Sequence, residues 1–115
     1  MALNINYIEL YSTDLTATKT FLSAAFGWVF TDYGPTYASF SKESAGLDGG
    51  VEQVEAGEAL DGGALLVLHA DDLAAARMEA LAQGARLTRD IFDFPGGRRF
   101  EFTAPGGPRM AVWGT

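Results

Sequence analysis

The two residues most clearly suited to catalysis or ligand binding are Tyr7 and Glu9, which lie two positions apart in an apolar segment. If this segment is a strand, alternation points both side chains to the same face of a sheet. A partly desolvated carboxylate there can take a proton from a bound molecule or anchor it by hydrogen bonds. Glu9 is therefore the candidate catalytic base. The structural alternative is a carboxylate paired with Arg98 or Arg99 across the sheet.

Three further side chains are candidates for contact with a small molecule. His69 is the only histidine. Because imidazole titrates near neutral pH, it is a possible acid–base partner of Glu9, and the alternative is a hydrogen-bonded residue at a strand end. Arg99 and Glu101 alternate with phenylalanines, so they are expected to face away from the core. Arg99 then suits a ligand carboxylate held by two parallel hydrogen bonds, and the alternative is an internal Arg99–Glu101 pair.

Composition excludes several other kinds of chemistry. The 115 residues include no cysteine, which rules out disulfides and thiolate chemistry, and one histidine with no nucleophile motif argues against a serine-type triad. The net charge of −7 argues against nucleic acid and anionic membranes as partners. No apolar run approaches the roughly 18 residues that span a bilayer, and the first residues do not resemble a signal peptide. We expect a cytoplasmic protein.

The elements that must position these residues are organised as a repeat. Residues 11–15 open one predicted helix and residues 69–73 open another, with their capping aspartates separated by 72 − 14 = 58 positions. In the first half, periodicity predicts a strand over 3–11 and a helix from the Asp14 cap to Phe26, ended by Gly27. Further strands are predicted over 28–33, 37–41 and 47–53.

The second half repeats this order. The pattern predicts a strand over 64–69, a helix from a cap at Asp71 or Asp72 to Gln83, and strands over 85–89, 98–103 and 109–113. The chain is thus expected to be one domain, 1–115, made of a first βαβββ module over 1–53, a linker over 54–62 and a second module over 63–115. Each module leaves one sheet face bare, so the two must combine to form a core.

A tandem βαβββ repeat with these motifs resembles the vicinal oxygen chelate superfamily, which includes glyoxalase I, bleomycin-resistance proteins and extradiol dioxygenases. The resemblance rests on the segment 7–15, the Phe26-Gly27-Trp28 block, the repeat at 69–73 and the turn around Pro105-Gly106. It implies an α+β fold in which curled half-cup sheets, with helices outside, line a cavity for small molecules. It also implies a homodimer, in some members with exchanged halves.

The resemblance also implies where a metal would be held. Metal-binding members carry a histidine seven residues before the helix-opening aspartate of each half, and a glutamate on the last strand. Those positions fall here on Tyr7, Leu65 and Ala111. Leucine and alanine offer no donor atom to a divalent ion, so no metal site and no cofactor are expected.

These observations favour a metal-free protein that binds a small organic molecule in a cup, as a binding protein or a non-metal enzyme. The alternative is a metal-dependent lyase or isomerase like glyoxalase I, or a dioxygenase, with non-standard ligands such as Glu9, His69 and Glu101. Five aromatic side chains are expected either to line the pocket or to fill the core: Tyr7, Tyr11, Trp28, Tyr37 and Trp113. The predicted ligand-binding residues are Tyr7, Tyr11, Leu65, Val67, His69, Arg99, Glu101 and Ala111.

Overall fold

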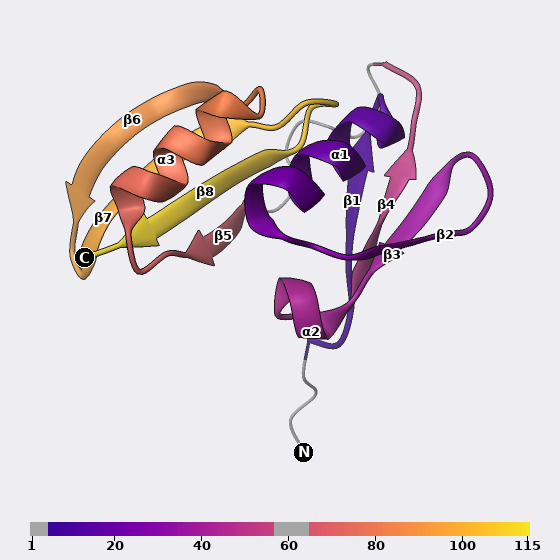
Figure 1. Cartoon of the computed structure of the whole chain (residues 1–115), viewed down its shortest axis with the longest axis horizontal. Helices are drawn as coiled ribbons and strands as arrows, with labels where there is room; N and C mark the ends of the chain where they lie inside the picture. The colour runs from indigo at the N-terminus through magenta and orange to yellow at the C-terminus, as the bar shows by residue number, and fades with distance from the viewer. Residues whose placement is uncertain (1–4, 57–64) are drawn as a thin grey trace.

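The computed structural model describes residues 5–56 and 65–115, which form two four-stranded sheets of identical topology (Figure 1). The elements of the first module are β1 Ile8–Ser12, α1 Leu15–Phe26, β2 Phe30–Asp32, β3 Tyr37–Phe40, α2 Lys42–Ala45 and β4 Gly49–Gln53. The elements of the second are β5 Leu66–His69, α3 Leu73–Ala82, β6 Arg86–Phe94, β7 Gly97–Thr103 and β8 Arg109–Gly114. The expected α+β architecture of two βαβββ modules is confirmed.

The strand order is the same in the two modules. It is β1-β4-β3-β2 in sheet A and β5-β8-β7-β6 in sheet B. The first and last strands of each module run parallel, and all other neighbours are antiparallel. A parallel neighbour requires a crossover connection, which the helix and the two intervening strands supply.

The helices begin where their capping residues predict. The Asp14 carboxylate accepts a hydrogen bond from the backbone N–H of Ala17 at 3.1 Å, and Asp72 does the same for Ala75 at 3.0 Å. Each bond satisfies a donor that the first helical turn leaves free. Gly27 ends α1 with φ 75°, a left-handed conformation that glycine adopts at low cost. Of the two candidate caps for α3, the structure therefore selects Asp72.

An ion pair between helix and sheet is also repeated. Lys19 of α1 lies 2.6 Å from Asp32 of β2, and Arg77 of α3 lies 2.7 Å from Asp90 of β6. The positions correspond at the interval of the repeat, since 77 − 19 = 58 and 90 − 32 = 58. The guanidinium of Arg77 lowers the pKa of Asp90, although both groups are exposed. The ion pairs thus support an internal duplication more than they support stability.

The inner faces of both sheets pack on the two helices, which lie next to each other in the middle of the molecule (Figure 1). The Phe102 ring of β7 lies 5.9 Å from Phe21 and 6.2 Å from Phe26, both on α1. On β1, the residues Ile8, Leu10 and Ser12 point toward the core. Helix α1 therefore contacts both modules and joins them through one core.

A buried polar contact fixes the two modules to each other. The hydroxyls of Ser12 and Thr18 lie 2.7 Å apart and are fully buried. Ser12 donates to the carbonyl of Gly106 at 3.3 Å and Thr18 donates to that of Pro105 at 2.5 Å, both in the turn between β7 and β8. Buried hydroxyls need such partners, so this turn of the second module completes the first.

The largest differences from the predicted elements are at β6, α2 and β1. Strand β6 continues to Phe94 because it pairs with β7 as far as Gly97, which reduces the expected loop to a turn at Pro95 and Gly96. The short helix α2 was not predicted, and it forms because the Ser41 hydroxyl accepts from the backbone N–H of Ser44. Strand β1 begins only at Ile8. Residues 3–4 of that predicted strand, residue 64 and most of the predicted linker lie outside the described residues.

No helix among the described residues is long and apolar enough to cross a membrane.

Candidate functional site

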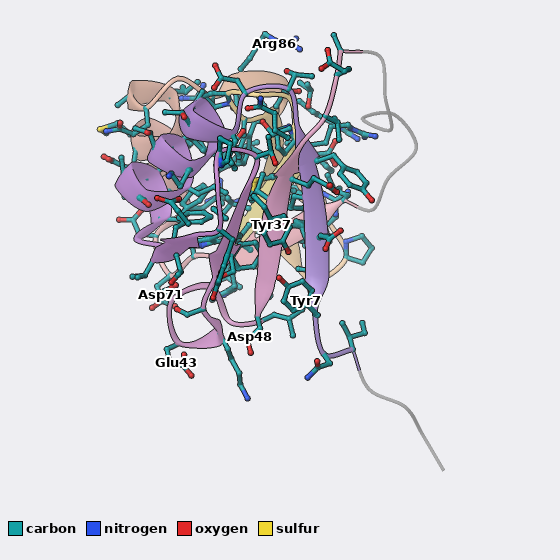
Figure 2. All side chains as sticks on the ribbon, turned by 90° about the vertical axis from the view of Figure 1, so that its right-hand side faces the viewer. Tyr7, Tyr37, Glu43, Asp48, Asp71 and Arg86 are labelled. Atoms are coloured by element: carbon teal, nitrogen blue, oxygen red, sulfur yellow. The ribbon has the colours of Figure 1, made fainter. Side chains whose placement is uncertain are left out.

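The outward face of sheet A carries the residues in which chemistry was predicted. Tyr7, Glu9 and Tyr11 are exposed, whereas Leu10 and Ser12 are buried, so β1 alternates as expected. Figure 2 views this face directly and shows Tyr7 and Tyr37 on the near side of the strands. Tyr7, which directly precedes β1, keeps 46% of its surface accessible. We call this surface the open face of sheet A.

Three side chains on this face form a hydrogen-bonded cluster. The hydroxyls of Tyr7 and Tyr37 lie 2.5 Å apart, and Tyr37 donates to Oε2 of Glu9 at 3.3 Å. Tyr37 reaches across the sheet because Gly50, on the strand between, has no side chain, and a Cβ there would collide with the Tyr37 phenol. The structure gives Glu9 this phenol as a partner and not Arg98 or Arg99. Its role as a base stays a prediction.

The cluster holds the phenol of Tyr37 in its neutral form. Partial burial raises the pKa of Tyr37 well above its ordinary value of 10.0, and the hydrogen bond and the charge of Tyr7 and the carboxylate of Glu9 raise it further. Desolvation and nearby negative charge both disfavour a phenolate. Tyr37 is therefore a lasting hydrogen-bond donor on this face.

Replacing Tyr37 with phenylalanine should reduce the loss of stability at alkaline pH. The native state keeps this proton above about pH 10, where the unfolded chain loses it. The contribution is therefore fully present below about pH 10 and is lost as the pH rises further. Removing the phenol should reduce the fall in the free energy of unfolding with pH by at most about 1.4 kcal/mol per pH unit, which is the limit for one proton. Urea unfolding between neutral and alkaline pH measures this slope.

The control for this experiment is Tyr33→Phe, because Tyr33 is an exposed tyrosine outside the cluster. It should keep the slope of the natural protein. A Tyr37→Phe variant with that same slope would show that the cluster does not hold the proton.

The outward face of sheet B is built from two rows of paired residues. One row places Val67, Ala111 and Glu101 opposite one another, and the next places His69, Trp113 and Arg99. We call this surface the open face of sheet B. Five of the predicted ligand-binding residues therefore share one face. Among them, Val67 is 47% accessible, whereas Ala111 is fully buried. Leu65, half-buried, directly precedes β5.

The charged pair on this face is internal. Nη2 of Arg99 donates to Oε2 of Glu101 at 2.7 Å, which agrees with the structural alternative for these two residues. The Arg99 guanidinium also lies 5.4 Å from the Phe92 ring and 5.7 Å from the Phe94 ring. Its Nε is buried and, within the described part of the chain, has no hydrogen-bond partner. Arg99 is thus held in place but not fully satisfied.

His69 lies at the end of β5 and packs against an aromatic side chain. Its ring contacts Trp113 edge to face, with centroids 4.6 Å apart, and its Nδ1 lies 4.0 Å from the exposed carboxylate of Asp71. Within one chain, it shares neither a face nor a hydrogen bond with Glu9. The structure therefore does not bring together the predicted acid–base pair of Glu9 and His69.

The two open faces lie on different sides of the helical layer. Each sheet turns its inner face to the shared core around α1, so the outward faces point away from that core (Figure 1). Within one chain, the Tyr7 cluster and the Arg99 row therefore do not face each other. A cup lined by both faces needs a second chain.

The residues at the family's metal positions do not fit a divalent ion. Tyr7 offers a single phenol on sheet A, and Leu65 and Ala111 on sheet B offer only hydrocarbon. Across residues 5–56 and 65–115, no three His, Cys, Asp or Glu side chains gather as a metal site would require. The side chains at these positions are instead suited to hydrogen bonding, through the phenol, and to apolar contact.

For several residues near the two faces, the pattern of the sequence gave no prediction or a wrong one. Phe92 and Phe94 lie on the open face of sheet B, but the predicted strand ended at residue 89 and hid their alternation. Gly50 had no signal beyond its place in a glycine pair. Trp28, a candidate for the pocket, is buried against Phe40 in the core.

Comparisons with known proteins agree with the fold. The family model Glyoxalase/Bleomycin resistance protein/Dioxygenase superfamily matches residues 4–112. A glyoxalase-related enzyme from Fulvimarina pelagi superposes with a TM-score of 0.80 at 21% identity, over 99% of this chain and 89% of that one. TnmS3, an antibiotic binding protein from Streptomyces sp. CB03234, superposes with a TM-score of 0.71 at 20% identity, over 99% and 98%. A search of curated proteins gave no match.

Proposed function

Because this chain belongs to the glyoxalase/bleomycin resistance protein/dioxygenase superfamily, we propose that it binds a small organic molecule without a metal ion. The observation that carries the proposal is the donor set at the family's metal positions, since Leu65 and Ala111 cannot coordinate a cation. The scaffold is otherwise complete in both modules. A protein that has lost the metal-coordinating residues but kept the scaffold still has the surface that binds a small molecule.

The open faces have the composition of a binding surface. Sheet A offers the phenols of Tyr7, Tyr11 and Tyr37, which combine apolar area with hydrogen-bonding groups. Sheet B offers Val67 and Trp113 beside the Arg99–Glu101 pair. Apolar walls with a few fixed polar groups are typical of small-molecule sites. The similarity to TnmS3, described as an antibiotic binding protein, supports the same class of function.

The proposed site is completed by a second copy of the chain. In this homodimer, the open face of sheet A of one protomer covers the open face of sheet B of its partner. The exposed aromatic and aliphatic surface at Tyr7 and Val67 favours such covering, because large apolar patches on a soluble surface are costly. The faces also complement each other in charge, with Glu9 and Glu52 on one and Arg89 on the other.

Sedimentation at micromolar concentration should therefore give twice the mass of the chain, and Val67→Arg should convert the protein to a monomer. The change places a charge in the proposed interface, where a buried unpaired charge is strongly unfavourable. Met78→Arg is the matched control, because Met78 is an exposed apolar residue on α3, outside both open faces. A monomeric natural protein, or dimers in both variants, would contradict the proposed assembly.

A further inference from the structure

A pocket on sheet B has a composition that points to one class of ligand. It has a volume of about 350 Å³ and lies beside the turn between β6 and β7. The residues that line it are Val67, Phe94, Pro95, Gly96, Arg99 and Trp113. Of these six, only Arg99 carries a charge. One cation among aromatic and aliphatic walls suits a molecule with a flat apolar body and one negative group.

The aromatic wall of this pocket is fixed by its neighbours. The Trp113 ring is held edge to face by His69, with centroids 4.6 Å apart, and by Phe94, at 6.1 Å. Strand β7 approaches β8 closely here because Gly97 has no side chain, and a Cβ at this position would collide with the carbonyl of Gly114. The indole is therefore a rigid surface against which a planar ring can stack.

The charged wall has unused hydrogen-bonding capacity. A guanidinium has five N–H donors, and Glu101 accepts from Nη2 of Arg99 through a single oxygen. The buried Nε of Arg99 finds no acceptor among the residues that the structure describes, which is energetically unfavourable. A carboxylate that enters the pocket can accept from the donors that Glu101 leaves free, in the two-pronged geometry that arginine favours. Glu101 then serves to orient the guanidinium.

We infer that the ligand of this protein is a flat aromatic carboxylate. Its ring stacks on the Trp113 indole beside Phe94, and its carboxylate binds Arg99. The inference rests on the proposed function and adds the chemical class of the ligand to it. A neutral aromatic molecule of the same shape would leave the free donors of Arg99 unsatisfied, so it should bind more weakly.

The test uses 2-naphthoate and its neutral analogue 2-naphthamide as probes, with calorimetry for affinity and the NMR signal of the Trp113 indole N–H for location. The signal is identified by its loss in Trp113→Phe. In the natural protein, 2-naphthoate should bind about tenfold or more tightly than 2-naphthamide and should shift the Trp113 signal. Arg99→Gln should remove this preference.

The matched control is Arg98→Gln, which removes the same charge from the neighbouring, exposed residue on the other side of the strand. It should keep the affinity for 2-naphthoate. Because Arg99→Gln leaves Glu101 without its partner, the double variant R99Q/E101Q provides the test in a chain without an unpaired carboxylate. Equal binding of both probes, equal losses in the two arginine variants, or no binding of 2-naphthoate would overturn the inference. Metal content, measured separately, decides the proposed function.

Discussion

Replacing Gly106 with alanine is expected to lower the free energy of unfolding by about 2–5 kcal/mol, a large part of the ~5–15 kcal/mol typical of a small domain. Gly106 has a φ of 92°, a left-handed conformation that costs alanine about 1–2 kcal/mol. A Cβ here would also collide with the hydroxyls of Thr18 and Ser12. The collision would break the buried contact between the modules and leave polar groups unsatisfied, at about 1–3 kcal/mol.

Gly46→Ala separates these two causes. Gly46 has a φ of 91°, nearly the same as Gly106, but a Cβ there would meet no atom of residues 5–56 and 65–115 within 4 Å. It should cost only the backbone strain, about 1–2 kcal/mol. Urea unfolding of both variants gives the comparison. Equal losses would show that the turn at Gly106 does not hold the modules together.

Replacing Phe102 with alanine is expected to cost about 3–5 kcal/mol, the range for removing a buried aromatic side chain. Phe102 is 1% exposed and lies 5.7 Å from Phe100, ring to ring, in addition to its contacts with two rings of α1. Its removal opens a cavity where sheet B meets the helix of the first module. Both modules should therefore lose stability together, in one unfolding transition.

Urea unfolding measures this loss, and Met78→Ala is its control. Met78 is 71% exposed, so its truncation should change the free energy of unfolding by no more than about 0.5 kcal/mol. If the alanine variant does not fold, Phe102→Leu, which keeps most of the volume, should fold with a loss of about 1–2 kcal/mol. A loss near zero in Phe102→Leu, or separate transitions for the two modules, would contradict a shared core.

Local signals in the sequence were sufficient to predict the elements and their order. Asp14 and Asp72 mark helix starts because their carboxylates cap backbone donors, and Gly27 marks an end because it adopts a positive φ. The alternation of Tyr7, Glu9 and Tyr11 correctly predicted one shared face. These features depend on residues close in sequence. Because both halves carry them, the same order of elements could be predicted for each module.

The arrangement of the candidate site depends on contacts between distant residues, which the sequence did not reveal. Tyr37 reaches Glu9 only because Gly50 leaves room on the strand between them. The direction of the two open faces is set by the docking of α1 on Phe102 and of Ser12 on the turn at Gly106. No periodicity within one module encodes that docking, so Glu9 and His69 were expected closer together than one chain allows.

The measurement that tests the proposed function most directly is the divalent-metal content of the protein, purified without an affinity tag. The protein should first be equilibrated with zinc, nickel, manganese or iron(II) and then dialysed. Because the side chains of Leu65 and Ala111 provide no donor atoms, we expect well below one ion per chain for each metal. A stoichiometric ion that Tyr7→Phe or Glu9→Gln removes would contradict it and favour a metal-dependent lyase, isomerase or dioxygenase.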